Sequence, residues 1–290
     1  MSWVKVGVGL PNTIPGISGA AILDWARRAD AGPFSSLASL DRLVYPNYEP
    51  LITLTAAAAV TTRIRLMTTV LLAPLRDTAI FAKQAASIDA LSGGRLTLGL
   101  GVGGREDDFR AAGVDFHTRG RRFAEQLEGM HRVWAGEPLV EGIGPIGPVP
   151  ARQGGPEVLI GGYTPKAMSR AARWGEGYIA GGAPPAQARQ GYQVVEAAWK
   201  EAGRPGKPRF VGASYYGLGE DARERAGRYI HGYYSFLGPR ADAIAGSLPA
   251  TPDAITATIQ AFADVGADEL VFWPCIADLD QVDRLAALVL

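Results

Sequence analysis

Glycines in this chain gather directly after apolar segments, where a ligand could lie against the main chain. The first such run is Gly99-Leu100-Gly101-Val102-Gly103-Gly104, which follows Leu96-Thr97-Leu98. Glycine has no Cβ, so it leaves room for a flat or phosphorylated ligand to approach the backbone closely. We therefore expect Gly101, Gly103 and Gly104 to contact a ligand.

The same run matches G-x-G-x-x-G, the phosphate-binding turn of dinucleotide-binding proteins. That turn follows a first strand and opens a helix. Here the run follows a fourth predicted strand, and we expect irregular sequence from Arg105 through Gly113 up to Arg119. We favour a turn at the end of a barrel strand over a dinucleotide fingerprint. A tight turn with no ligand is the second alternative.

The elements that must position these glycines alternate regularly along the chain. The pattern predicts strands at Val4 to Leu10, Leu37 to Leu40, Ile64 to Leu71, Leu96 to Gly101, Val158 to Gly161, Gly177 to Ala180, Phe210 to Tyr216 and Glu269 to Pro274. It predicts helices at Ala20 to Ala31, Leu51 to Thr61, Thr78 to Leu91, Arg119 to Trp134, Pro165 to Trp174, Ala186 to Ala202, Asp221 to Tyr234, Pro252 to Val265 and Asp278 to Val289.

Apolar strands that alternate with helices are typical of a parallel sheet covered by helices. Eight such units in 290 residues favour a single α/β domain, a (β/α)8 TIM-type barrel spanning 1–290, since that fold needs about 250 residues. Pro138 to Pro156 is rich in Gly and Pro and has no helical or strand period. We expect it to form a short irregular insertion between the fourth helix and the fifth strand.

Composition excludes several classes of function. Lys+Arg and Asp+Glu are both 29, so nothing in the charge indicates a nucleic-acid or acidic-membrane partner. No apolar run is long enough for a membrane helix, and the start of the chain lacks the pattern of a signal peptide, so we expect a cytoplasmic protein. The lone Cys275 and the scattered His117, His131 and His231 predict no metal site.

Several segments together resemble the luciferase-like family of flavin-dependent oxidoreductases, which includes bacterial luciferase, alkane-sulfonate monooxygenases and enzymes that use the deazaflavin coenzyme F420. The resemblance covers nearly the whole chain. It rests on Val6-Gly7-Val8-Gly9-Leu10-Pro11-Asn12, Thr62-Arg63-Ile64-Arg65-Leu66, Ala82-Lys83-Gln84, Leu91-Ser92-Gly93-Gly94-Arg95, Pro156-Glu157-Val158-Leu159-Ile160-Gly161-Gly162 and Ala171-Ala172.

The resemblance implies a cofactor ring at the C-terminal ends of the barrel strands. It also implies a non-proline cis peptide at Thr69-Val70, with Val70 pressing against the ring; an ordinary trans bond in a buried strand is the alternative. We assign the cofactor phosphate to Gly161-Gly162-Tyr163-Thr164, because a helix start with free N–H groups follows there. Gly181 and Gly182 would form a second wall, and in either case Thr164 would cap the helix.

The chain departs from its relatives after the second strand. Many F420-using relatives carry an Asp-His pair there, whereas this chain has Asp41-Arg42. A guanidinium stays charged and cannot shuttle protons near neutral pH. We place Asp41 near the cofactor and expect Arg42 to hold an anionic substrate or the reduced ring, with a plain Asp41–Arg42 ion pair as the alternative. His117 is then the remaining candidate for proton transfer, and a surface histidine without a role is the competing interpretation.

These residues predict an oxidoreductase in which a reduced cofactor passes hydride to a small organic substrate or reacts with molecular oxygen. Both F420 and FMN stay open, with the overall pattern closer to relatives that use F420. Aromatic residues expected near strand ends would line a substrate pocket: Tyr45, Tyr48, Tyr163, Tyr215, Tyr216 and Trp273. A cofactor-binding protein without turnover is the main alternative. A cofactor-free lyase or isomerase is disfavoured, and a homodimer is left open.

Overall fold

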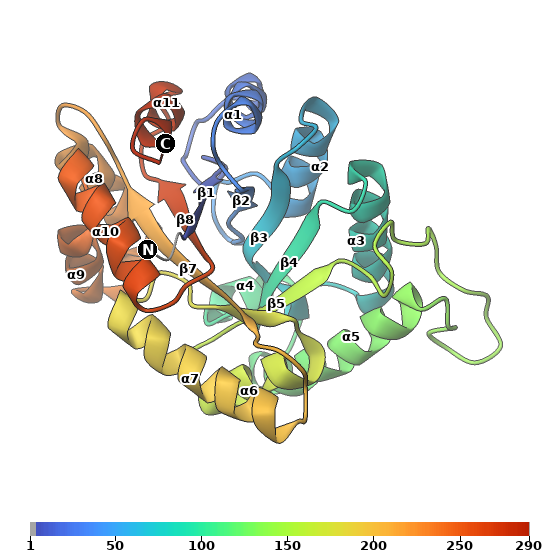
Figure 1. Cartoon of the computed structure of the whole chain (residues 1–290). Helices are drawn as coiled ribbons and strands as arrows, with labels where there is room; N and C mark the ends of the chain where they lie inside the picture. Colours follow the sequence, from blue (N-terminus) through green and yellow to red (C-terminus); the bar gives the residue numbers. More distant parts are fainter. Residues whose placement is uncertain (1–3, 290) are drawn as a thin grey trace.

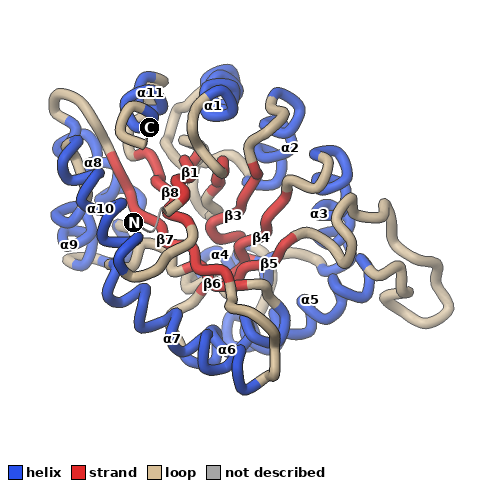
Figure 2. The backbone as a smooth tube through the Cα atoms, viewed as in Figure 1, coloured by secondary structure: helices blue, strands red, loops and turns tan. Residues whose placement is uncertain are grey.

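Eight parallel strands follow one another around a closed barrel (Figures 1 and 2). The structure is a computed structural model that describes residues 4–289; residues 1–3 and 290 of the expected domain lie outside the described range. The strands are β1 Lys5–Gly9, β2 Ser36–Ser39, β3 Arg65–Leu72, β4 Leu96–Gly101, β5 Glu157–Gly161, β6 Gly177–Ile179, β7 Arg209–Tyr216 and β8 Glu269–Pro274. The predicted barrel is confirmed, and its closure excludes the dinucleotide-fingerprint interpretation, which requires an open sheet.

Helices surround the barrel on its outer face, as the tube view shows (Figure 2). They are α1 Gly19–Ala31, α2 Pro50–Val60, α3 Thr78–Ser92, α4 Glu106–Ala111, α5 Arg119–Trp134, α6 Pro165–Trp174, α7 Pro185–Glu201, α8 Ala222–Tyr233, α9 Arg240–Ser247, α10 Pro252–Asp264 and α11 Asp280–Ala286. Short 3-10 turns occur at η1 Ala73–Leu75, η2 Phe116–Thr118 and η3 Ser235–Leu237.

Two of these helices were not expected from the sequence. α4 follows the glycine run, where we expected irregular sequence, and it is a single short helix ended by Gly113 at a φ of 67°. Its first turn carries Glu106, Asp107 and Asp108, and acidic side chains stabilise the positive end of a helix. α9 lies in the connection between α8 and α10, where its eight residues were too few to give a clear helical period.

Each strand divides its side chains between two apolar clusters. Leu66 belongs to the larger cluster and Met67 to the smaller one, and the same alternation holds for Val158 and Leu159. Because successive side chains of a strand point to opposite faces, one cluster packs between sheet and helices and the other fills the barrel interior. All these side chains are buried, which explains why the strands are apolar on both faces.

The stretch from 138 to 156 contains neither helix nor strand, as expected. Figure 1 shows it extending away from the barrel beyond α5. Two contacts with α3 hold it: Lys83 donates to the carbonyl of Gly147 at 2.9 Å, and the main-chain N–H of Arg152 donates to Asp89 at 3.0 Å. The insertion therefore lies at the rim and adds no strand to the barrel.

Candidate functional site

A cavity of about 310 Å³ opens at the C-terminal ends of β3, β4, β5 and β6. We call it the mouth cavity. Its lining contains most of the residues that the sequence assigned to a cofactor: Thr69, Val70, Gly101, Gly103, Gly104, Gly161, Gly162, Tyr163 and Gly181. Leu72, Val102 and Ile179 complete the wall. The glycine runs after β4 and β5, far apart in sequence, thus come together around one hollow.

Val70 occupies the gap between two strand-end glycines. A Cβ on Gly101 would lie 2.8 Å from one methyl group of Val70, and a Cβ on Gly161 would lie 2.9 Å from the other. Neither contact is sterically acceptable, so both neighbours must be glycine while Val70 stands between them. The Thr69-Val70 peptide bond is cis, as the resemblance implies.

Hydrogen bonds fix the residue before Val70. The indole N–H of Trp273 on β8 donates to the hydroxyl of Thr69 at 2.9 Å, and that hydroxyl donates to the carbonyl of Ser39 on β2 at 3.3 Å. All three residues are buried. These bonds cross the barrel interior, so Trp273 supports the cavity wall from inside.

The other side of the cavity is the turn between β5 and α6. Gly162 has a φ of 148°, a conformation that glycine adopts readily, and a Cβ there would lie 2.5 Å from the Cβ of Ala167. The hydroxyl of Thr164 accepts from the N–H of Ala167 at 3.3 Å, which confirms the expected cap, and Pro165 occupies the first helical position. Tyr178 donates to the carbonyl of Gly162 at 3.0 Å and holds the turn.

Gly181 and Gly182, expected to form one wall together, separate in the structure. Gly181 has a φ of 56° and lines the mouth cavity. A Cβ on Gly181 would lie only 2.5 Å from the hydroxyl oxygen of Tyr163. Gly182 lines a different hollow, together with Pro184 and Ser214. Tyr163 itself is 60% exposed, so it stands at the rim of the mouth cavity.

Asp41 lies beside the mouth cavity, and its carboxylate is held by neighbouring residues. Its carboxylate accepts from Arg76 at 2.7 Å and from the N–H of the cavity residue Leu72 at 2.8 Å. Burial raises the pKa of Asp41, and the positive charge of Arg76 offsets part of that rise. Arg76 also pairs with Glu49 at 2.8 Å. The structure therefore gives Asp41 a supporting position under β3.

The family model described as luciferase-like monooxygenase matches residues 4–272. The chain belongs to the luciferase-like monooxygenase family. A curated relative, the uncharacterized protein Rv0940c of Mycobacterium tuberculosis, is 32% identical over 207 residues, which cover 62% of this chain and 71% of the relative.

Two solved structures have the same fold as this luciferase-like chain. The monooxygenase RslO1 from Streptomyces bottropensis superposes with a TM-score of 0.78 at 23% identity, over 98% of this chain and 97% of the other. An F420-dependent secondary alcohol dehydrogenase, in complex with an F420-acetone adduct, gives a TM-score of 0.80 at 17% identity, over 99% and 98%. At these identities the likeness is one of fold.

Arg42, which we expected to hold an anionic substrate or the reduced ring, follows β2. It is 8% exposed, and its Nη1 donates to the carbonyl of Tyr233 at 2.5 Å. Its guanidinium lies 4.3 Å from the ring centre of Tyr45 and 5.0 Å from that of Tyr233. Burial and the nearby Arg105 lower its pKa. Among residues 4–289 no carboxylate lies within 4.0 Å of Arg42, so the alternative Asp41–Arg42 ion pair is not formed.

The aromatic surroundings of Arg42 come largely from α8 and η3, which sequence reasoning did not assign to the site. Tyr215 on β7 bonds through its hydroxyl to Tyr234 at 2.9 Å, and Tyr229 bonds to Thr13 at 2.7 Å. Burial raises the pKa of Tyr234 to about 12 and also raises that of Tyr215 well above its usual value. These phenols thus stay protonated near neutral pH.

Three other predicted residues lie away from the mouth cavity. His117 is exposed and lines a separate groove of about 580 Å³ between α5 and α6. Tyr216 is buried in the larger core cluster and donates to the carbonyl of Gln281 at 3.2 Å, so the expectation that it lines a pocket is wrong. Tyr48 is 42% exposed and donates to the carbonyl of Ile17 at 3.1 Å.

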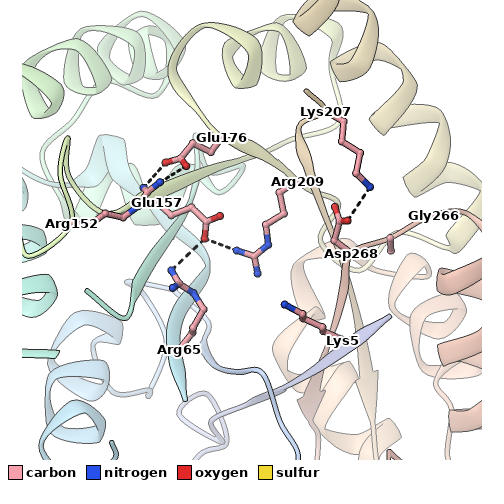
Figure 3. A pocket seen from close by; sticks show the side chains of 10 residues that line it. Lys5, Arg65, Arg152, Glu157, Glu176, Lys207, Arg209, Gly266 and Asp268 are labelled. Atoms are coloured by element: carbon pink, nitrogen blue, oxygen red, sulfur yellow. Dashed lines mark hydrogen bonds and ion pairs between the residues drawn. The ribbon is translucent and has the colours of Figure 1, made fainter. Parts of the chain in front are cut away.

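A hollow of about 790 Å³ lies at the opposite end of the barrel, where the strands begin (Figure 3). Charged side chains fill it in pairs: Arg209 bonds to Glu157 and Glu269, and Arg152 bonds to Glu176. In TIM-type barrels this end serves stability, and active sites occupy the other end. We therefore assign the hollow of Figure 3 to the barrel scaffold.

Within residues 4–289, no helix has the length and apolar character needed to cross a bilayer. In the same range, no group of three or more His, Cys, Asp or Glu side chains is placed to hold a metal ion.

Proposed function

We propose that this luciferase-like chain is an oxidoreductase that binds reduced F420 at the mouth cavity and transfers a hydride to a small organic substrate. The observation that carries the proposal is the cavity itself, where glycines from β4, β5 and β6 surround Val70 at the C-terminal end of the barrel. This is the end at which TIM-type barrels place their chemistry. The F420-dependent dehydrogenase of the same fold supports the choice of cofactor.

The residues present fit a flat ring. Gly101 and Gly161 leave no room for a Cβ, while Gly104 faces open space, so the wall beside Val70 is backbone rather than side chain. Val70, Leu72 and Ile179 supply apolar surface on which an aromatic ring would bury itself. We assign the ring to this surface.

The start of α6 fits the cofactor phosphate. α6 has ten residues, and its first turn follows Gly162 and Thr164 directly. The positive end of a helix stabilises an anion, and the absence of a side chain at Gly162 lets the anion approach the main chain. Lys166 in the same turn adds a full positive charge. We assign the phosphate to Gly161–Thr164.

Such a cofactor supplies the hydride when it is bound. The chain's own contribution is orientation and exclusion of water, because the apolar wall of the mouth cavity keeps the reacting atoms away from solvent. We assign Arg42 a binding role for an anionic group, since a guanidinium does not exchange protons near neutral pH. His117 lies outside the cavity, and we route no proton transfer through it.

A monooxygenase reaction with molecular oxygen is the second candidate. The description of the family model and the structural neighbour RslO1 favour it. In the first candidate reaction the reduced cofactor would pass a hydride to an organic substrate, whereas in the second it would react with molecular oxygen. FMN is the natural cofactor of the second reaction.

Titration of the purified protein with F420 and, separately, with FMN tests the proposal, with quenching of cofactor fluorescence as the signal. We expect micromolar or tighter binding of F420. Reoxidation of the reduced complex is then followed with candidate carbonyl substrates without oxygen, and with oxygen alone. Binding without any acceleration over free cofactor would indicate a binding protein without turnover, and no binding of either cofactor would refute the proposal.

A further inference from the structure

The groove between α5 and α6 is lined by basic side chains and by no acidic ones. Its titratable lining residues are His117, Arg121, Lys166, Arg170 and Arg173, in a hollow of about 580 Å³. We call it the basic groove. The chain as a whole has equal numbers of acidic and basic residues, so this concentration of one sign is local. A groove lined by one sign of charge attracts ligands of the other sign.

Few carboxylates neutralise the basic groove from its edges. Arg121 pairs with Glu125 at 3.7 Å on the surface of α5. Within residues 4–289, no carboxylate lies within 4.0 Å of Lys166, Arg170 or Arg173. Arg170 donates to the carbonyl of Gly120 at 3.0 Å and joins the two helices, while Arg173 lies 4.8 Å from the ring centre of Trp174. Three full positive charges thus face the groove without a counter-ion.

The basic groove and the mouth cavity are separate hollows that flank the start of α6. Tyr163 lines the cavity and Lys166 lines the groove, and three residues of chain span at most about 11 Å. The second connection runs through η2: Phe116, next to His117, packs edge-on against Phe109 at 5.3 Å, and Phe109 lies against Gly103 of the cavity. A ligand whose phosphate lies at the start of α6 can therefore continue into the groove.

We propose that the basic groove binds the chain of carboxylates that F420 carries beyond its phosphate. F420 continues from the phosphate into a lactyl group and a series of glutamate units, whereas FMN ends at the phosphate. A string of carboxylates matches a row of unpaired guanidinium and ammonium groups in charge and in extent. The inference rests on the proposed function and makes it more specific, because the groove would select F420 over FMN.

The test compares three ligands on one pair of variants. The ligands are F420, FMN and the tail-free deazaflavin riboside, which has the F420 ring but neither phosphate nor carboxylates. The test variant is Arg121→Gln with Arg173→Gln, which removes two exposed charges of the groove and leaves Lys166 in place. The matched control is Arg27→Gln with Arg284→Gln, which removes two exposed charges from α1 and α11.

We expect the test variant to weaken F420 binding roughly threefold to thirtyfold at low salt, with the difference shrinking at high salt. FMN and the riboside should bind the test variant as they bind the unmodified protein, and the control variant should change none of the three affinities. Unchanged F420 affinity in the test variant, or an equal loss for FMN, would overturn the proposal. Binding of FMN without F420 would overturn it while leaving a flavin-dependent function, and binding of neither would refute both.

Discussion

A bulky side chain at Gly104 should block the mouth cavity without disturbing the fold. Gly104 lines the cavity, a Cβ on it would meet nothing within 4 Å, and its φ lies outside the positive range that only glycine tolerates well. If the phenyl group of Gly104→Phe displaced the cofactor from about 100 Å² of apolar surface, binding would weaken by about 2.5 kcal/mol, or roughly 70-fold in Kd. Fluorescence titration with F420 and FMN measures the change.

A control variant separates the blocked cavity from a general effect of added bulk. Gly144 lies in the exposed insertion, also meets nothing within 4 Å, and also lacks a positive φ. Gly144→Phe should bind the cofactor as the unmodified protein does, and both variants should unfold within about 0.5 kcal/mol of it. Equal cofactor affinity in Gly104→Phe and Gly144→Phe would refute the assignment of the ring to the mouth cavity.

Three further predictions concern buried polar groups. Arg76→Met should cost about 3–5 kcal/mol in urea unfolding, because it leaves the buried Asp41 without its positive partner; a loss below 1 kcal/mol would contradict this. Burial by itself raises the pKa of Glu157, but Arg209, Thr97 and Arg65 outweigh burial and lower that pKa. The stability that Glu157 contributes is therefore present above pH 4.5, its ordinary pKa, and is lost as the pH falls through the pKa of the folded state. Glu157→Gln should therefore flatten the acid limb of a stability–pH curve, and an unchanged limb would show that other carboxylates set it. Burial raises the pKa of the Cys275 thiol, so iodoacetamide should label it only in denaturant, as mass spectrometry would show; rapid labelling of the native protein would contradict its burial.

The barrel could be predicted from the sequence because its strands are buried on both faces. β4 and β8 were predicted with the bounds that the structure shows, and the other strands differ by one residue at one or both ends. Continuous apolar segments that end in Gly or Pro mark such strands without help from distant residues. α4 and α9 were missed because six or eight residues carry little helical period.

The cavity wall could be predicted where glycine marks it, and not where apolar side chains form it. Gly101, Gly103 and Gly161 gave a local signal, since each ends or follows a strand. Leu72 and Ile179 line the same cavity, but nothing in their type distinguishes them from core residues.

The surroundings of Asp41 and Arg42 depend on contacts that no local pattern contains. The partner of Asp41 is Arg76, thirty-five positions further along the chain, and the acceptor of Arg42 is the carbonyl of Tyr233, separated by 191 positions. Both contacts arise only when the barrel closes and brings the loop after β2 against η1 and α8. Sequence reasoning placed these two residues at the correct end of the barrel and could not assign their partners.

Arg42 shows why the identity of one residue does not settle a mechanism. A histidine exchanges protons near neutral pH, whereas the guanidinium of Arg42, which lies over the ring of Tyr45 and donates to the carbonyl of Tyr233, does not. Arg42 instead keeps its charge, and burial without a carboxylate partner makes that charge costly. An anionic group delivered by the substrate would offset this cost, and an uncharged one would not. We therefore expect Arg42 to favour substrates that carry a negative charge, and we expect no proton transfer from this position.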